Sequence, residues 1–229
     1  MKKMHSLSKT DFAVFCLLAV CSGLIIGIGG ISSLLARFYF GDWGRLIGAI
    51  LFSLGIFAIV AYELRLFTGM VADIPKMHLD KIWTLPVCFL GNILGVAVVA
   101  LLAYFSPVKS AILPIAQEII AAKFVSEQWP IYALTSSIFC GGLITLSVWS
   151  VKFAPKKGLS PTVGVMLPII VFAFCGFDHS VANMLYFYYF GEFSWRVIGY
   201  ILLSVVGNIF GGIVLPLISL YREKSQTSK

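Results

Sequence analysis

Uncharged apolar runs long enough to cross a lipid bilayer are the feature that most constrains this chain. The first, residues 12–36, carries no charged side chain, and a helix needs about 20 apolar residues to span the hydrocarbon core. Five further runs follow, at residues 46–62, 83–105, 129–151, 161–177 and 197–221. A soluble domain carries roughly 25% charged residues, whereas this chain carries 12%, so lipid must cover much of its surface. The sequence therefore predicts an all-α membrane protein with six transmembrane helices.

The chain length suits a single transmembrane domain over residues 1–229, without a separate soluble domain. The formal net charge of +7 does not indicate a nucleic-acid partner, because the basic residues lie mostly between apolar runs, where the positive-inside rule explains them. The first run is too long for a cleavable signal peptide. The five cysteines all fall within apolar runs and are interpreted as small buried side chains. We expect no metal and no cofactor.

The distribution of basic residues predicts the orientation in the membrane. Six spans place both termini on one side, and that side carries eleven of the 17 Lys and Arg residues. The opposite side carries five, and Arg65 lies within a span. The positive-inside rule therefore predicts a multi-pass protein of the cytoplasmic (inner) membrane with both termini in the cytoplasm. The eleven residues are Lys2, Lys3, Lys9, Lys76, Lys81, Lys152, Lys156, Lys157, Arg222, Lys224 and Lys229, and the five are Arg37, Arg45, Lys109, Lys123 and Arg196.

Two similar halves are visible in the sequence. The third and sixth runs each contain a Gly-Asn motif, Gly91-Asn92 and Gly207-Asn208, and the second and fifth runs each end in a polar break. The separation along the sequence between the two motifs is nearly the same as the separation between the two breaks. Because each half has an odd number of spans, the second copy must be inverted, as in many channels and transporters. We expect repeat one at about residues 10–105, repeat two at about 128–222, and broken second and fifth helices. Chance similarity of glycine-rich segments is the alternative.

His179, in the second break, is the main candidate for function. Apolar residues resume after it, so the break is expected at membrane depth, where irregular backbone is tolerated only against protein or a water-filled cavity. An ionisable group there usually marks a pathway, and histidine can exchange a proton near neutral pH. The alternative is a neutral histidine that clamps backbone groups. Both interpretations stay open on the sequence alone.

The acids of the two breaks, Glu63 and Asp178, are expected to support the interrupted helices. Each can accept hydrogen bonds from the backbone N–H groups that a broken helix frees, or pair with Arg65. Thr68 lies in the first break, and an inverted repeat would bring it near His179 at the middle of the membrane. We therefore expect a hydrogen bond of about 2.7–3.2 Å between Thr68 and His179.

These motifs resemble the formate/nitrite transporter family. The most specific segment is residues 176–184, GFDHSVANM, which is similar to the family signature around a central histidine. The sequence LFT at residues 66–68 resembles the first break of the family, and both Gly-Asn motifs match. The resemblance covers nearly the whole chain. Asp178 stands where glutamate is usual, and Gly141 stands where asparagine is usual.

The resemblance implies an aquaporin-like fold and a homopentamer in which each protomer has its own pore. It also implies a substrate pathway in which His179 is the central pore histidine and Thr68 its hydrogen-bonding partner, with Lys123 in the outer vestibule and Asn183 in the same signature. The positions that would form apolar constrictions are Phe52, Ile56, Leu66 and Phe172. The implied substrates are small monovalent anions, namely formate, nitrite or hydrosulfide.

Transport of such an anion is expected to involve a proton. A bare anion crossing apolar rings would lose hydration that it cannot recover, whereas a weak-acid anion can take a proton near the central histidine and cross as the neutral acid. Either His179 or water could supply this proton. The expected partners are therefore the anion, protons and membrane lipid. A neutral small-solute channel is the alternative function. An intramembrane enzyme using His179 with Asp178 or Cys175 is disfavoured, because no second histidine or serine elbow lies nearby in the sequence.

Overall fold

The structure is a computed structural model of the chain, and it describes residues 8–153, 160–191 and 194–227. Within these ranges every regular element is a helix. The α-helices are α1 (Lys9–Phe40), α2 (Gly44–Ala61), α3 (Phe67–Met70), α4 (Thr84–Tyr104), α5 (Lys109–Phe124), α6 (Trp129–Phe153), α7 (Pro161–Cys175), α8 (Ala182–Phe190) and α9 (Trp195–Thr227). Three short 3₁₀ segments complete the list, η1 (Gly41–Trp43), η2 (Val71–Lys76) and η3 (Leu79–Lys81). Of the residues used to predict the orientation, Lys2, Lys3, Lys156, Lys157 and Lys229 lie outside the described residues.

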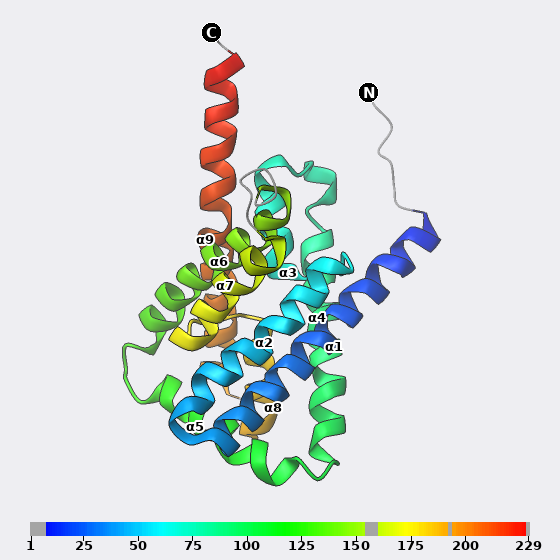
Figure 1. Ribbon diagram of the computed structural model, residues 1–229. Helices are drawn as coiled ribbons and strands as arrows, with labels where there is room; N and C mark the ends of the chain where they lie inside the picture. The colour runs from blue at the N-terminus through cyan, green and yellow to red at the C-terminus, as the bar shows by residue number, and fades with distance from the viewer. Residues whose placement is uncertain (1–7, 154–159, 192–193, 228–229) are drawn as a thin grey trace.

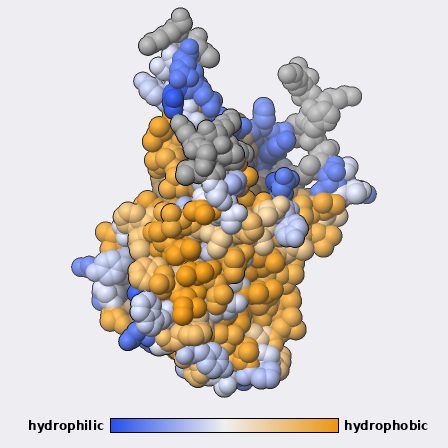
Figure 2. Space-filling view, viewed as in Figure 1, coloured by the Kyte–Doolittle hydropathy of each residue, from blue (hydrophilic) through white to orange (hydrophobic). Residues whose placement is uncertain are grey.

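Long apolar helices form the body of the protein. Four helical stretches are long and apolar enough to cross a membrane, and α7 is a shorter apolar helix. The stretches are Lys9–Ala61, Leu79–Tyr104, Trp129–Val151 and Trp195–Gln226. Hydrophobic residues cover most of the visible body, and hydrophilic residues gather toward its ends (Figure 2). The start of α1 and the end of α9 lie at the same end of the molecule, and α5 lies at the opposite end (Figure 1).

The connection between the third and fourth apolar runs contains a further helix. No span is predicted over residues 106–128, and the structure forms α5 there. Ala111, Ile112, Ala116 and Ile120 of α5 are buried. Charged residues interrupt this segment, so it shows no span-length apolar run, yet it buries an apolar face against the rest of the bundle. The helix carries Lys123 into the interior.

Glycines allow two pairs of helices to approach closely. A Cβ atom at Gly23 of α1 would collide with the backbone carbonyl of Asn92 in α4, and one at Gly141 of α6 would collide with that of Asn208 in α9. Small residues at such crossings let helix backbones touch, which is how helices associate without a hydrophobic driving force. The same contact thus joins α1 to α4 and α6 to α9.

Both the second and the fifth apolar runs are interrupted, and they end with the same local structure. At the end of α2, Glu63 has a left-handed φ of 52°, and Leu64 N–H donates to the Ile59 carbonyl at 2.9 Å. At the end of α7, Gly176 has φ 74°, and Phe177 N–H donates to the Phe172 carbonyl at 3.0 Å. This is the Schellman ending of a helix, in which a left-handed residue lets the chain turn away.

The shared helix ending fixes which residues of the two breaks are equivalent. Glu63 corresponds to Gly176, and two residues further on Arg65 corresponds to Asp178. The two acids that drew attention to the breaks therefore occupy different positions. Glu63 terminates a helix, whereas Asp178 lies in the irregular segment beyond one.

Candidate functional site

A buried asparagine holds the first break in place. Asn92 of α4 is fully buried, and its Oδ1 accepts a hydrogen bond from Phe67 N–H at 2.8 Å. Its Nδ2 donates to the carbonyls of Ala19 and Arg65, each at 2.8 Å. One amide therefore satisfies a donor and an acceptor that the interrupted helix leaves free, and it ties both to α1. Buried polar groups are costly when unpaired, so this side chain stabilises the irregular backbone.

An asparagine of the second half holds the second break in the same way. Asn208 of α9 is 1% exposed, and its Oδ1 accepts from Ser180 N–H at 2.9 Å. Its Nδ2 donates to the carbonyls of Ser137, at 2.8 Å, and Asp178, at 2.9 Å. The partners occupy positions equivalent to those around the other asparagine. The sequence shows the Gly-Asn motif twice, but reading it only as a mark of repetition misses what the asparagine does.

Thr68 and His179 meet between the two halves. The Thr68 Oγ1 to His179 Nε2 distance is 2.9 Å, so the expected hydrogen bond is present. Thr68 is fully buried and His179 is 1% exposed. Ala182 N–H donates to His179 Nδ1 at 3.1 Å. A ring nitrogen that accepts a hydrogen bond carries no proton, so in the neutral ring Nε2 carries the hydrogen and donates to Thr68. The tautomer is assigned from these partners.

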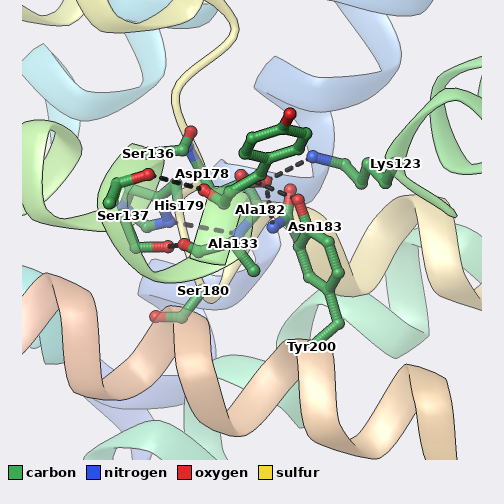
Figure 3. A network of polar contacts seen from close by, with 12 residues as sticks. Lys123, Ala133, Ser136, Ser137, Asp178, His179, Ser180, Ala182, Asn183 and Tyr200 are labelled. Carbon is green, nitrogen blue, oxygen red and sulfur yellow. Dashed lines mark hydrogen bonds and ion pairs between the residues drawn. The ribbon is translucent and has the colours of Figure 1, made fainter. Parts of the chain in front are cut away.

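Asp178 lies at the centre of a second polar cluster (Figure 3). Its carboxylate accepts hydrogen bonds from Asn183 Nδ2 at 2.9 Å and from the Tyr200 hydroxyl at 2.8 Å. Lys123 Nζ forms an ion pair with the same carboxylate, and Asp178 N–H donates to Ser136 Oγ at 3.0 Å. The carboxylate is thus held by side chains from α5, α8 and α9. It was expected to accept freed backbone N–H groups or to pair with Arg65, and its observed carboxylate partners are these side chains instead.

Two cavities lie at opposite ends of α2. The first has a volume of about 350 Å³ and is lined by Lys123, Asp178, His179 and Asn183, among others. The second has a volume of about 310 Å³ and lies beside the first break. Its lining includes Glu63, Arg65 and Asp73, together with apolar residues of α2, α3 and α6.

Four buried apolar side chains lie between these cavities. Phe52 and Phe172 line the first cavity, and their rings meet edge to face with centroids 5.8 Å apart. Ile56 and Leu66 line the second. All four are at most 4% exposed. Phe172 also stacks on the His179 ring at 5.8 Å. The four residues that the resemblance assigns to constrictions thus belong to one buried apolar cluster, in which Phe172 contacts the histidine.

Glu63 lies away from this centre. Its side chain is exposed and faces the second cavity, and no ion pair joins it to Arg65 within the described ranges. Its contribution to the break comes from its backbone, which adopts the left-handed conformation at the end of α2. No cluster of three His, Cys, Asp or Glu side chains suited to a metal ion occurs in the part of the chain that the structure describes.

Comparison with known proteins assigns the chain to a family. A family model described as Formate/nitrite transporter matches residues 1–222. The chain belongs to the formate/nitrite transporter family. The resemblance carried by residues 176–184 is therefore confirmed, and the chain is a multi-pass membrane protein of a family of channels and transporters.

Curated relatives are about a quarter identical to this chain over the aligned residues. The uncharacterized transporter YrhG of Bacillus subtilis is 27% identical over 214 residues, covering 82% of this chain and 77% of the relative. The formate channel FocA of Haemophilus influenzae is 28% identical over 158 residues, covering 62% of this chain and 53% of FocA. The formate channel FocB of Escherichia coli is 24% identical over 199 residues, covering 79% of this chain and 67% of FocB.

Solved structures show the same fold. One described as an FNT family ion channel gives a TM-score of 0.75 at 21% identity and covers 93% of this chain and 91% of that chain. Another, described as a pentameric formate channel with formate bound, gives a TM-score of 0.76 at 19% identity and covers 96% of this chain and 100% of that chain. The all-helical arrangement described above is therefore the fold of this family.

Proposed function

We propose that this chain is a channel for small monovalent anions of weak acids, with formate, nitrite and hydrosulfide as candidate substrates. The observation that carries this proposal is the pair of cavities separated by Phe52, Phe172, Ile56 and Leu66, with the Thr68–His179 hydrogen bond beside them. Two water-accessible cavities that face each other across a thin apolar barrier form a pathway for a small solute. The family membership favours an anion as that solute.

The proposed pathway runs between two inverted three-helix repeats within six transmembrane spans. Matching Schellman endings, at Glu63 and Gly176, and matching asparagine contacts support the repeat. In this arrangement each half contributes one interrupted helix, and the two breaks face each other at the middle of the membrane. We place both termini in the cytoplasm, because the start of α1 and the end of α9 lie at one end of the molecule and most basic residues are predicted there.

The apolar barrier determines the form in which a substrate crosses. A bare anion entering it would lose its hydration without gaining hydrogen bonds, which costs several kcal/mol. Low dielectric surroundings also disfavour the charged form of an acid. A formate ion that reaches the barrier therefore takes up a proton and crosses as formic acid. It releases the proton in the second cavity, so that anion and proton move together.

In this mechanism His179 acts as a neutral hydrogen-bond donor, and water supplies the proton. Ala182 N–H already points at Nδ1, so forming an imidazolium would replace a hydrogen bond with two opposed donors. A neutral ring cannot give up its Nε2 hydrogen without becoming an anion. The Nε2–H group instead orients the Thr68 hydroxyl, and this hydroxyl keeps its own hydrogen to offer to a passing oxygen atom.

We further propose that the chain assembles as a homopentamer in the cytoplasmic membrane, with one pathway per protomer. The solved neighbour described as a pentameric formate channel supports this assembly. Large exposed hydrophobic side chains, including Leu90, Leu101 and Phe210, are available to face lipid or a neighbouring protomer. Mass measurement of the purified protein in mild detergent tests the stoichiometry, and a stable monomer would contradict it.

Solute flux into proteoliposomes tests the function. Purified protein is reconstituted in lipid vesicles, and shrinkage followed by reswelling is recorded after mixing with an osmotic excess of formate, nitrite, hydrosulfide or glycerol. We expect faster reswelling than in protein-free vesicles with at least one anion and no acceleration with glycerol. Acceleration by glycerol alone would establish the neutral-solute channel instead. A Phe52→Ala variant should raise all fluxes if the four apolar residues form the barrier.

A further inference from the structure

The first cavity carries an excess of positive charge that Lys123 does not supply. The side chains of Lys123 and Asp178 are 13% and 4% exposed and form an ion pair. At short range in a low-dielectric site the two charges largely cancel for any ion further away. The other charged side chains that line this cavity are Arg37 and Arg45. Within the described ranges neither of these arginines forms an ion pair. The net attraction of the first cavity for an anion therefore comes from these two arginines.

The local fold brings both arginines to one place. Arg37 lies in the last turn of α1 and Arg45 near the start of α2. The glycine before Arg45 permits this approach, because a Cβ atom at Gly44 would collide with the backbone of Arg37. The Arg45 guanidinium lies 5.6 Å from the centroid of the Phe174 ring, and its Nη2 would be 3.0 Å from a Cβ atom at Gly176. Stacking on an aromatic ring fixes the guanidinium plane and leaves its N–H edge free.

We propose that Arg37 and Arg45 form an anion-recognition site in the first cavity, and that this site selects small oxyanions with two neighbouring oxygens. A guanidinium presents two parallel N–H donors, which match a carboxylate or nitrite better than a single-atom acceptor such as hydrosulfide. The inference rests on the proposed function and identifies the residues that first bind the anion. The ion then moves on to the barrier at Phe52 and Phe172, which line the same cavity.

Among the described residues, no matching pair of arginines lines the second cavity. Its charged lining residues are Glu63, Arg65 and Asp73, so two acids accompany one base. These described side chains give an anion no net attraction from this side. We therefore assign capture by Arg37 and Arg45 to the first cavity, and the two directions of flux should depend differently on these two residues.

Formate uptake and efflux in intact cells that express the full chain, and lack other formate transport, test the proposal. Initial rates are measured over a range of formate concentrations at low and high ionic strength. For Arg45→Gln we expect the half-saturating concentration for uptake to rise about threefold to tenfold and its dependence on ionic strength to weaken. The maximal rate should change less than about twofold, because the barrier is untouched. Arg37→Gln should act in the same direction.

A charge-conserving variant separates recognition from simple attraction. Arg45→Lys keeps the charge but loses the planar pair of donors, so it should retain the ionic-strength dependence and lose the preference for formate over hydrosulfide. Arg196→Gln is the matched control, because Arg196 is exposed, is paired with Glu127 and does not line the cavity. It should behave as the unmodified protein.

The outcomes distinguish failure of the proposed channel function from failure of the proposed recognition site. If the unmodified protein carries none of the three anions, the proposed function is wrong. If it carries them and the arginine variants keep the original half-saturation and anion preference, the recognition site is wrong and the channel stands. If Arg45→Gln fails to assemble, Arg45→Lys and Arg37→Gln decide by the same criteria. An effect seen only in efflux supports the site and reverses the predicted orientation.

Discussion

Replacing Asn92 or Asn208 with leucine should destabilise the protein by similar amounts. Each asparagine makes three hydrogen bonds to the backbone, at 2.8–2.9 Å, and both are essentially buried. Leucine is similar in size but makes none of them. Hydrogen bonds within membrane proteins are worth about 0.6–1.7 kcal/mol each, so losing three costs about 2–5 kcal/mol. Because the two side chains hold equivalent positions, neither half should tolerate the change better.

Unfolding of the purified variants in mild detergent measures this loss. Tryptophan fluorescence is followed during titration with a denaturing detergent, at one fixed protein concentration, because assembly makes stability depend on concentration. Ser204→Ala is the control. Ser204 is fully buried on α9, near Asn208 in sequence, and its Oγ has no hydrogen-bond partner within the described residues. Loss of the Ser204 hydroxyl should lower the free energy of unfolding by less than about 0.5 kcal/mol.

Unequal results would refute the reasoning. If Asn92→Leu lowers the free energy of unfolding strongly and Asn208→Leu behaves like Ser204→Ala, the two breaks are not held in the same way. The repeat would then be a likeness of sequence without a common structural role.

Three further changes probe other parts of the protein. Lys123→Met should destabilise by on the order of 3 kcal/mol, because it leaves the buried Asp178 carboxylate unpaired. Adding Asp178→Asn should recover part of this loss, and no recovery in a thermal melt would contradict the pairing. His179→Asn should lower formate flux but preserve its rise at acidic pH, since water supplies the proton in the proposed mechanism. A flat pH profile in proteoliposomes would instead make His179 the proton donor. Glu63→Gly should stabilise the protein by about 0.5–1 kcal/mol by relieving a left-handed backbone, whereas Gly176→Ala should destabilise it, and equal melting temperatures would contradict both.

The sequence predicts those features that local chemistry determines. Apolar runs reveal the long helices, because lipid requires continuous apolar stretches. The polar residues around Glu63 and His179 reveal the two interruptions, since an ionisable group within a span is rare. The Thr68–His179 hydrogen bond was predicted once both breaks were assigned to the middle of the membrane. The signals for the helices and the breaks lie within short segments, and the repeat relates the two breaks to each other.

Apart from the Thr68–His179 hydrogen bond, contacts between distant segments were not predicted. The ion pair between Lys123 and Asp178 joins α5 to the second break. No sequence feature near either residue indicates that the two side chains pair. The helix α5 itself lacks a span-length apolar run because charged residues interrupt it. The roles of Asn92 and Asn208 could have been found from their repetition, because a buried amide beside a broken helix is a natural partner for the freed backbone groups.

The role of the arginines in the first cavity also could not be predicted from the sequence. Arg37 and Arg45 appear in the sequence as loop charges that set the orientation, and the positive-inside rule explains them without further function. Only the folded chain places both on one cavity with Asp178 already occupied by Lys123. Electrostatic function depends on which charges are compensated, and compensation is a property of tertiary structure.

A pH-sensitive dye trapped inside proteoliposomes shows directly whether the substrate crosses the barrier as a neutral acid. An inward formate gradient is applied at equal internal and external pH, with the membrane potential clamped by potassium and valinomycin. We expect the lumen to acidify faster than in protein-free vesicles, at a rate that does not change with the clamped potential, because formate and a proton enter together. Formate influx that leaves the internal pH unchanged and accelerates when the interior is made positive would show that the bare anion crosses, and would contradict the mechanism.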